Sequence, residues 1–208
     1  TLKQARLRTL EHDNFTFHQA DIADKRVIPT LAASGVGAIV HLAAQPGVRY
    51  SLEDPFAYVT ANMMGHTVML ELARTIKVAH FVYASSSSVY GTNKKAPFAV
   101  GDAVENPNSL YAATKRANEV MSASYAHLYR LPLTGLRFFT VYGPWGRPDM
   151  MMWIFTRAMF AGEPIPVFND GQMERDFTFI ADIVAGVIAA HDNPPPDDSA
   201  EKAGGSVA

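Results

Sequence analysis

Short apolar runs alternate with longer helical patterns along much of the sequence, and this alternation limits the fold more than any other feature. The runs are nearly continuous in apolar residues, which is typical of strands covered on both faces. Helical patterns with one apolar stripe separate them. This order predicts βαβ units in a doubly wound, parallel α/β sheet. We expect strands at 15–21, 36–42, 79–85 and 133–139, and helices at 55–76 and 110–128.

The sequence changes character after residue 139. A loop rich in glycine and proline at 143–148 precedes a predicted helix at 150–161, which Gly162 and Pro164 end. A short strand at 166–168 and a helix at 179–191 are expected next, and this part suits a substrate-binding extension of the sheet. The tail from Asn193 is predicted to be a loop or linker, and Thr1 falls within a predicted charged helix.

The residue content excludes several classes of protein. With 18 Lys and Arg against 20 Asp and Glu, the net charge is −2, so no basic footprint for nucleic acid is present. The absence of cysteine rules out disulfides and thiol nucleophiles, and the seven histidines have no metal-ligand spacing. No run reaches the roughly 18 apolar residues of a membrane span, and no signal peptide is seen. We therefore expect a cytoplasmic chain without a bound metal, a membrane or a nucleic-acid partner.

Polar and small residues follow each predicted strand, in the segments 21–22, 41–45, 85–88 and 139–142. Ligands of open α/β sheets bind at the carboxyl ends of the strands, so these residues are candidates for a binding site. Each segment also has a plainer explanation. Asp21 suits a helix cap, Ala43 and Ala44 suit tight packing, and the serine run suits a turn.

Tyr111 and Lys115 are four residues apart on the predicted helix 110–128, so they share a face one turn from each other. A tyrosine with a pKa near 10 is a poor base at neutral pH, but a nearby lysine cation favours the phenolate and lowers that pKa. Both residues lie off the apolar stripe, which weakens a packing explanation. The spacing also arises by chance, yet here it follows a serine cluster at a strand end, and this order favours a catalytic pair.

The Tyr111–Lys115 segment is one of five motifs that occur in a characteristic order. They are HLAAQPGVRYS (41–51), SSSSVYG (85–91), SLYAATK (109–115), LRFFTVYGPWGRPDM (136–150), and RDFT (175–178) with Asp182. In this order the chain resembles the extended short-chain dehydrogenase/reductase family, specifically its nucleotide-sugar epimerases and dehydratases. The likeness is greatest to UDP-glucuronate 4-epimerases and extends from about Leu2 to His191. It implies a Rossmann-like, NAD-binding sheet.

The resemblance implies a role for each matching residue. Tyr111 matches the catalytic base, Lys115 the lysine that holds the nicotinamide ribose, and Ser86 the hydroxyl that binds the reacting sugar oxygen. The implied cofactor contacts are Asp21, Ile22, Leu42, Ala43, Ala44, Asn62 and Phe139, besides Tyr111 and Lys115. The implied contacts to the UDP-sugar are Ser86, Ser88, Thr140, Arg147 and Arg175. For Asn62 and Ser88, a purely structural polar role stays open.

Arg147 bears on the choice of sugar, and two interpretations of it are open. It is either a loop arginine that is solvated or paired with Asp149, or a clamp on the C6 carboxylate of a uronic acid. The planar guanidinium suits such two-pronged contact with a carboxylate. Neutral UDP-glucose would leave this charge unused, so the second interpretation favours a uronate substrate.

The implied activity is NAD-dependent epimerisation at C4 of a UDP-sugar, UDP-glucuronate to UDP-galacturonate, through a transient 4-keto intermediate. Dehydration is disfavoured because Ser87 and Ser88 stand where dehydratases of the family carry an acidic pair. A UDP-glucuronate decarboxylase, another nucleotide-sugar epimerase, and an inactive fragment that only binds a nucleotide sugar stay open as alternatives. Family members commonly dimerise through two helices, here 55–76 and 110–128, so we expect a homodimer in the full-length form.

One part of the family pattern is missing. The family opens with a strand, a glycine-rich pyrophosphate turn and a helix, and this sequence contains no such glycine turn. We therefore expect an internal piece of a longer protein, lacking the first βαβ unit, that binds NAD weakly and is inactive alone. The expected division is a partial Rossmann-like NAD-binding domain at 1–142, the start of a substrate-binding region at 143–192, and a tail at 193–208.

Overall fold

The computed structural model describes residues 1–167, 169–172, 174–196 and 206–207. Contacts divide the chain into two compact units, each of which is described by itself. The larger unit comprises Ala20–Phe139 and the chain from Val184 onward, and the smaller unit comprises Thr1–Gln19 and Thr140–Ile183. The domain division expected at residue 142 stays a prediction.

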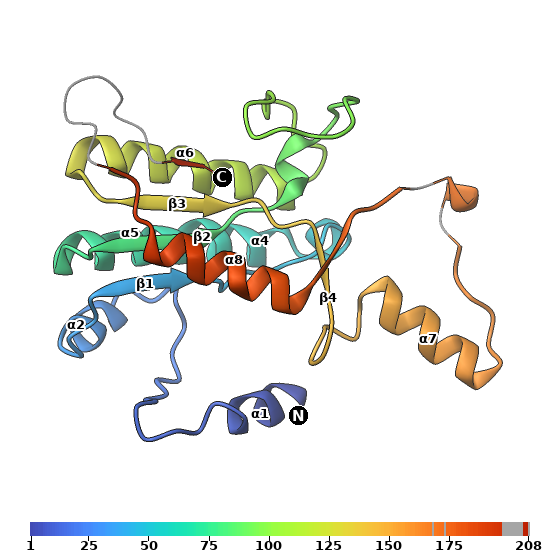
Figure 1. The fold of residues 1–208 in the computed structure, drawn as a ribbon, viewed down its shortest axis with the longest axis horizontal. Helices are drawn as coiled ribbons and strands as arrows, with labels where there is room; N and C mark the ends of the chain where they lie inside the picture. The colour runs from blue at the N-terminus through green and yellow to red at the C-terminus, as the bar shows by residue number, and fades with distance from the viewer. Residues whose placement is uncertain (168, 173, 197–205, 208) are drawn as a thin grey trace. The chain divides into compact units, whose positions relative to one another are not determined.

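The larger unit is built on a parallel sheet (Figure 1). The strands predicted at 36–42, 79–85 and 133–139 are confirmed as β1 (Ala38–His41), β2 (His80–Ala84) and β3 (Leu133–Leu136). Ile39 pairs with Phe81, and Val82 pairs with Thr134, both in parallel. A fourth strand, β6 (Ser206–Val207), pairs with the outer edge of β3, which gives the order β1-β2-β3-β6. The predicted parallel α/β class is therefore confirmed.

Two predictions about strands were wrong. The tail was expected to be a loop, but Ser206 and Val207 join the sheet, because the free edge of β3 supplies backbone partners that no local pattern reveals. The segment 15–21 was expected to be a strand, yet it forms no strand in the described structure, and Phe17 is 54% exposed. Among the described strands β1 is hydrogen-bonded only to β2, so no sheet edge pairs with this segment.

The helix predicted at 55–76 is confirmed, but it is wound in three parts. First comes α4 (Pro55–Tyr58), whose N-cap Asp54 accepts a hydrogen bond from the Ala57 N–H at 3.1 Å. The π-helical segment η1 (Val59–Met64) follows, and then α5 (Gly65–Ile76). Segments of π-helix are rare and frequently occur at functional sites. This one contains Asn62, a predicted site residue.

The helix predicted at 110–128 is confirmed as α6 (Leu110–Tyr129). Ser109 caps its start, because the Ser109 hydroxyl accepts the Ala112 N–H at 3.1 Å. Three short elements were not expected: α2 (Val27–Ala32), α3 (Tyr50–Glu53) and the 3₁₀ turn η2 (Ser87–Tyr90). Each is too short for a hydrophobic period to show in the sequence.

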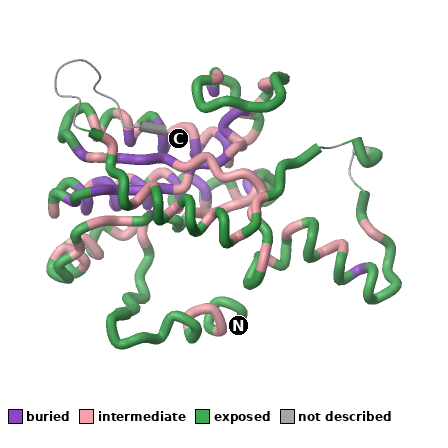
Figure 2. Tube along the Cα trace, viewed as in Figure 1, coloured by how far each residue is buried: buried purple, intermediate pink, exposed green. Residues whose placement is uncertain are grey.

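The core of the larger unit lies between the sheet and helices α5 and α6 (Figure 2). Leu70, Phe81 and Leu133 are fully buried within it. Val82, on the opposite face of β2, is also fully buried, so β2 is covered on both faces, as its continuous apolar run predicts.

The part of α8 (Ile180–Asp192) that belongs to the larger unit lies in front of the sheet in Figure 1 and confirms the helix predicted at 179–191. Buried His80 ties its last turn to the sheet. His80 Nδ1 lies 2.9 Å from the His191 carbonyl, and His80 Nε2 lies 2.9 Å from Thr134 Oγ1. One side chain therefore joins β2, β3 and α8.

The smaller unit contains α1 (Leu2–Arg8), the parallel pair β4 (Thr140–Tyr142) and β5 (Phe177–Phe179), α7 (Met151–Ala161) and the 3₁₀ turn η3 (Asn169–Gly171). Thr1 is the N-cap of α1 rather than a residue within the helix, and α7 confirms the helix predicted at 150–161. Of the strand expected at 166–168, residues 166 and 167 form none, and Phe168 lies outside the described residues. No helix in the described parts of the chain is long and apolar enough to span a membrane.

Candidate active site

Tyr111 and Lys115 lie in the first turns of α6, on the face that their spacing predicts. The Tyr111 ring makes an edge-on contact with the Tyr58 ring, with the centroids 6.1 Å apart. Lys115 is only 4% exposed, and its Nζ donates a hydrogen bond to the Ala84 carbonyl at 2.9 Å. The ammonium therefore lies at the carboxyl end of β2, two residues before Ser86.

Burial controls the protonation of the groups around Lys115. It lowers the pKa of Lys115 from 10.5 to about 8. His41, at the end of β1, stacks on His66 of α5 with the ring centroids 5.4 Å apart. Burial, with a smaller contribution from the Lys115 charge, lowers the pKa of His41 to about 4, and burial also holds the pKa of His66 well below its usual range. Both imidazoles are therefore neutral at pH 7, and Lys115 is the charged group of the three.

The serine run forms a tight turn directly after β2. Ser86 is the N-cap of η2, and its hydroxyl accepts the Ser88 N–H at 3.2 Å. The Ser87 N–H donates to the Phe138 carbonyl at 2.9 Å, which joins the turn to the end of β3. Ser86 is 7% exposed, and Ser88 lies in the first turn of the 3₁₀ helix. The turn interpretation and the proposed substrate role of these serines are thus compatible.

Asn62 braces the loop that follows β1. Its Oδ1 accepts the Gln45 N–H at 2.7 Å, and its Nδ2 donates to the Gln45 carbonyl at 3.1 Å and to Thr114 Oγ1 at 3.0 Å. Thr114 in turn donates to the Tyr111 carbonyl at 2.9 Å. This chain of bonds holds the loop that carries Leu42, Ala43 and Ala44 to the helix of Tyr111. A direct contact between Asn62 and the cofactor stays a prediction.

The remaining cofactor-side candidates lie in three loop segments of the larger unit, at 21–22, 42–44 and 139. Leu42 is 56% exposed and Ala43 is also exposed, so this loop offers an apolar surface just beyond β1. Asp21 is exposed and accepts the Ala23 N–H at 2.9 Å, which makes it a turn former. Ile22 packs on the core over Gly65, and a Cβ at Gly65 would come within 2.8 Å of Ile22. Phe139 packs near Tyr90 and Phe98, after the end of β3.

Three of the predicted substrate contacts belong to the smaller unit. Thr140 opens β4, and Arg175 is exposed and donates to the Glu174 carbonyl at 2.6 Å. Arg147 forms a two-pronged pair with Asp149, with Nε 3.0 Å from Oδ1 and a second bond from Nη2 to Oδ2. The hydrogen bonds from Arg147 hold the pKa of Asp149 below its usual range. The ion pair that was one of the two interpretations of Arg147 is therefore present.

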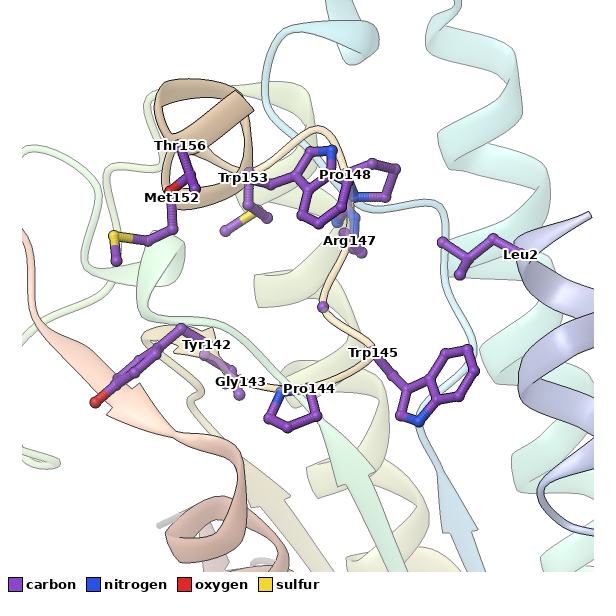
Figure 3. A pocket seen from close by; sticks show the side chains of 13 residues that line it. Leu2, Tyr142, Gly143, Pro144, Trp145, Arg147, Pro148, Met152, Trp153 and Thr156 are labelled. Carbon is purple, nitrogen blue, oxygen red and sulfur yellow. The ribbon is translucent and has the colours of Figure 1, made fainter. Parts of the chain in front are cut away.

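Arg147 also lines a pocket of about 450 Å³ within the smaller unit. Figure 3 shows Trp145 and Trp153 on either side of Arg147, with Pro148 beside it. Arg6 of α1 donates to the carbonyls of Trp145 and Gly146, the second at 3.1 Å, and this ties the loop before Arg147 to α1. The lining is largely apolar, so a charged group entering it would find Arg147 as its main partner.

Sequence reasoning missed Glu119 and Arg137, which form a buried ion pair beside the serine turn, with Arg137 Nε 2.9 Å from Glu119 Oε1. The one available signal was the position of Glu119, four residues after Lys115 on the same helix face. Among the described residues, no group of three or more His, Asp or Glu side chains could hold a metal ion.

The parallel sheet, the tyrosine–lysine pair of α6 and the serine turn after β2 define a Rossmann-like protein of the extended short-chain dehydrogenase/reductase class. The chain belongs to the NAD dependent epimerase/dehydratase family, whose model matches residues 2–202. The resemblance seen in the sequence is thereby confirmed.

Several of the similar curated proteins and solved structures are named as UDP-glucuronate 4-epimerases. The chain is 48% identical over 201 residues to the probable UDP-glucuronate 4-epimerase of Rhizobium meliloti, covering 96% of this chain and 59% of the relative. It is 46% identical over 211 residues to UDP-glucuronate 4-epimerase 4 of Arabidopsis thaliana, covering 99% of this chain and 47% of that protein. The UDP-glucuronic acid 4-epimerase of Bacillus cereus, crystallised with UDP-glucuronic acid and NAD, matches with a TM-score of 0.86 and 35% identity, over 99% of this chain and 63% of that one. The chain thus spans about half to three-fifths of these proteins.

Proposed function

We propose that the protein is an NAD-dependent UDP-glucuronate 4-epimerase, which interconverts UDP-glucuronate and UDP-galacturonate. The observation that carries this proposal is the seating of Lys115 on the Ala84 carbonyl, which brings the tyrosine–lysine helix to the strand end that presents Ser86. The names of the relatives and of the Bacillus cereus structure support the choice of sugar.

The residues of the larger unit suit an NAD molecule. The loop at 42–44, in which Leu42 and Ala43 are exposed, follows the carboxyl end of β1 and is held in place by Asn62. Lys115 offers an ammonium donor at the neighbouring strand end. Asp21, Ile22, Leu42, Ala43, Ala44 and Phe139 would contact the cofactor, with Asn62 bracing the loop beneath it. NAD, when bound, would supply the acceptor, and in its reduced form the donor, of the hydride at the sugar C4.

The reaction then needs only proton transfer and positioning from this chain. Tyr111 as phenolate takes the proton of the 4-hydroxyl, and the Lys115 cation favours that phenolate. The Ser86 hydroxyl donates to the reacting sugar oxygen and holds it near Tyr111. After the 4-keto sugar turns over, Tyr111 returns the proton, so the configuration at C4 changes with no net oxidation.

The binding of the sugar nucleotide is assigned to the residues that the family resemblance implies. Ser88, Thr140 and Arg175 are the proposed contacts to the substrate, with Arg175 on its diphosphate. Arg147 binds the carboxylate of Asp149 through two hydrogen bonds, the same two-pronged geometry that a uronate carboxylate would need. We infer that the C6 carboxylate of the sugar displaces Asp149 from this clamp.

Two other activities are separated by their products. A UDP-glucuronate decarboxylase also begins with oxidation at C4 but yields a UDP-pentose and carbon dioxide. A dehydratase needs an acid for the leaving C6 hydroxyl, and Ser87 and Ser88 at the corresponding positions offer none. A binding module without activity would leave the substrate unchanged.

The test is product analysis with protein made from its complete natural gene. Incubation with UDP-glucuronate and NAD should give UDP-galacturonate, resolved by chromatography and NMR, with no accumulation of NADH. A UDP-pentose with released carbon dioxide would replace the epimerase proposal with the decarboxylase. Unchanged substrate would favour the binding module.

We further propose a homodimer through the helical segments 55–76 and 110–128. Apolar side chains on these helices are open to solvent in the single chain, including Phe56 at 79%, Met64 at 54% and Val120 at 54% exposed. An exposed apolar surface of this kind commonly marks an interaction site. Sedimentation should show a dimer that Phe56→Asp converts to a monomer.

A further inference from the structure

One carboxylate on the catalytic helix collects four hydrogen bonds inside the larger unit. Glu119 is 1% exposed and lies one turn after Lys115 on α6. It accepts hydrogen bonds from Ser85 Oγ at 2.6 Å, from Arg137 Nε and Nη2 at 2.9 and 3.0 Å, and from Arg116 Nη1 at 3.1 Å. Each carboxylate oxygen thus accepts two hydrogen bonds, which compensate the buried negative charge.

The partners of Glu119 stand beside the site candidates of two other elements. Ser85 is the residue before Ser86, and its N–H donates to the Leu136 carbonyl at 2.8 Å. Arg137 is followed by Phe138, whose carbonyl accepts the Ser87 N–H. The Glu119 carboxylate therefore joins three places: the helix of Tyr111 and Lys115, the start of the serine turn after β2, and the end of β3 before Phe139.

The network is charged and rigidly held. Burial would raise the pKa of Glu119, but the hydrogen bonds from Arg137 and Ser85 outweigh burial and keep it below its usual value, so the carboxylate is ionised. The Arg137 guanidinium also lies over the Tyr90 ring, 5.0 Å from its centroid, and donates to the Val100 carbonyl at 3.0 Å. A buried ion pair is by itself weak evidence for stability, so the placement of this pair calls for another explanation.

We propose that Glu119 is a positioning residue, which through Ser85 sets the distance between the Ser86 hydroxyl and the Tyr111–Lys115 pair. This inference rests on the proposed function. The Ser85–Glu119 bond is a direct side-chain link between the first residue of the serine turn and α6. Loss of that link should let the turn shift while the ion pair and the fold remain, because Glu119 keeps its bonds to Arg137 and Arg116.

Ser85→Ala is the informative variant, and Ser122→Ala is its matched control. Glu119→Gln would leave Arg137 buried beside a neutral group, and a loss of folding there would be uninformative. Ser85 and Ser122 are both buried serines, 3% and 2% exposed, and the hydroxyl of each is bonded to a buried side chain. Ser122 lies on the same helix as Glu119 but bonds His66 Nε2 at 2.9 Å, away from the serine turn.

Two measurements are made on protein from the complete natural gene. In steady-state assays with UDP-glucuronate and NAD, Ser85→Ala should lower kcat about tenfold with KM little changed, because a misplaced catalytic group slows the chemical step. Ser122→Ala should keep kcat within about twofold of the parent while losing comparable thermal stability. Amide hydrogen exchange should quicken at Ser87 and Ser88 in Ser85→Ala only.

Each outcome decides the proposal. Equal losses of kcat in the two variants, or unchanged exchange at Ser87 and Ser88 in Ser85→Ala, would overturn it and leave Glu119 a structural residue. If the parent protein fails to epimerise UDP-glucuronate, the proposed function is wrong. The exchange measurement still decides the positioning role in that case, because it needs no substrate.

Discussion

Lys115 shows how a single residue can serve function at a cost in stability. Its side chain is almost completely removed from water, and its ammonium donates a hydrogen bond to the Ala84 carbonyl. Burial therefore disfavours the charged form, which the proposed chemistry requires. A fall in pKa from 10.5 to about 8 corresponds to roughly 3 kcal/mol at neutral pH.

Lys115→Met should consequently be inactive and more stable than the parent at pH 7. The methionine side chain removes the buried charge and its cost. It also leaves the Ala84 carbonyl without its donor, and this loss costs about 1 kcal/mol. The net gain in the free energy of unfolding is about 1–2 kcal/mol. Between pH 8 and 10.5 the unfolded parent binds more protons than the folded parent, so parent stability should rise with pH relative to the variant. Urea unfolding across this window checks the sign. A constant difference would show that Lys115 is not desolvated.

Tyr111→Phe should abolish turnover and leave the fold intact. Only the hydroxyl is removed from a ring that still packs against Tyr58. The expected loss is about 10²–10⁴-fold in kcat, the usual contribution of a general base. Tyr125→Phe on the same helix is the control, because its hydroxyl bonds Glu71 at 2.7 Å and has no proposed catalytic role. Activity of Tyr111→Phe within about tenfold of the parent would remove Tyr111 from the role of base.

Arg147→Ala should weaken the handling of UDP-glucuronate, by roughly the 1.5–3 kcal/mol of a charged hydrogen bond. It should also increase the decarboxylated side product, because a clamped carboxylate resists loss of carbon dioxide, while UDP-glucose binding changes little. Arg157→Ala, an exposed arginine of α7, is the control. Equal losses for the two sugars would make Arg147 structural and would remove the physical support for a uronate substrate.

At the scale of the elements, the close contact between β2 and β3 limits which side chains fit. β2 and β3 run in parallel with Tyr83 opposite Gly135, and a Cβ on Gly135 would lie 2.5 Å from Tyr83 Oη. The tyrosine is 1% exposed, so it has no room to retreat. The absence of a side chain at Gly135 thus leaves the space that the Tyr83 ring occupies.

Gly135→Ala should destabilise the larger unit by about 1–3 kcal/mol, the range for overpacking a close-packed core. Gly37→Ala, just before β1, is the control, since a Cβ there meets nothing within 4 Å. Thermal unfolding followed by circular dichroism measures both variants. The same melting temperature for the two would mean that the Tyr83 ring rearranges freely.

At the scale of the whole molecule, the predicted site residues are divided between the two units. The base, its lysine and the serine turn belong to the larger unit, whereas Thr140, Arg147 and Arg175 belong to the smaller one. Binding of NAD needs one more part, because pyrophosphate groups normally bind backbone N–H groups of a glycine turn at a helix N-terminus. The sequence of this chain holds no such turn.

Residues 1–208 should therefore bind NAD weakly or not at all. Lys115 and the Leu42–Ala44 loop account for only part of a dinucleotide, and the pyrophosphate would lack its usual backbone donors. Isothermal titration calorimetry on this chain, beside protein from the complete natural gene, makes the comparison. Micromolar binding by residues 1–208 would contradict the expectation and show that the donors come from elsewhere in the chain.

The sequence was sufficient for features that depend on neighbouring residues. The continuous apolar runs predicted β1, β2 and β3, and the 3.6-residue period predicted the helices that became α5 and α6. Motif order was enough to find the family, and the four-residue spacing placed Tyr111 and Lys115 on one helix face. All of this information is local, because side-chain direction follows directly from position in a helix or strand.

Only the tertiary structure decided which distant groups meet. Segment 15–21 has a strand-like pattern but pairs with none of the described strands, whereas Ser206 and Val207 have little pattern and join β3. Asn62 turned out to brace the loop after β1, and Glu119 to join Ser85 to Arg137. The physical reason is that a hydrogen bond or a strand pairing needs a partner at a fixed distance in space, and the residues next to it in the sequence do not specify that partner.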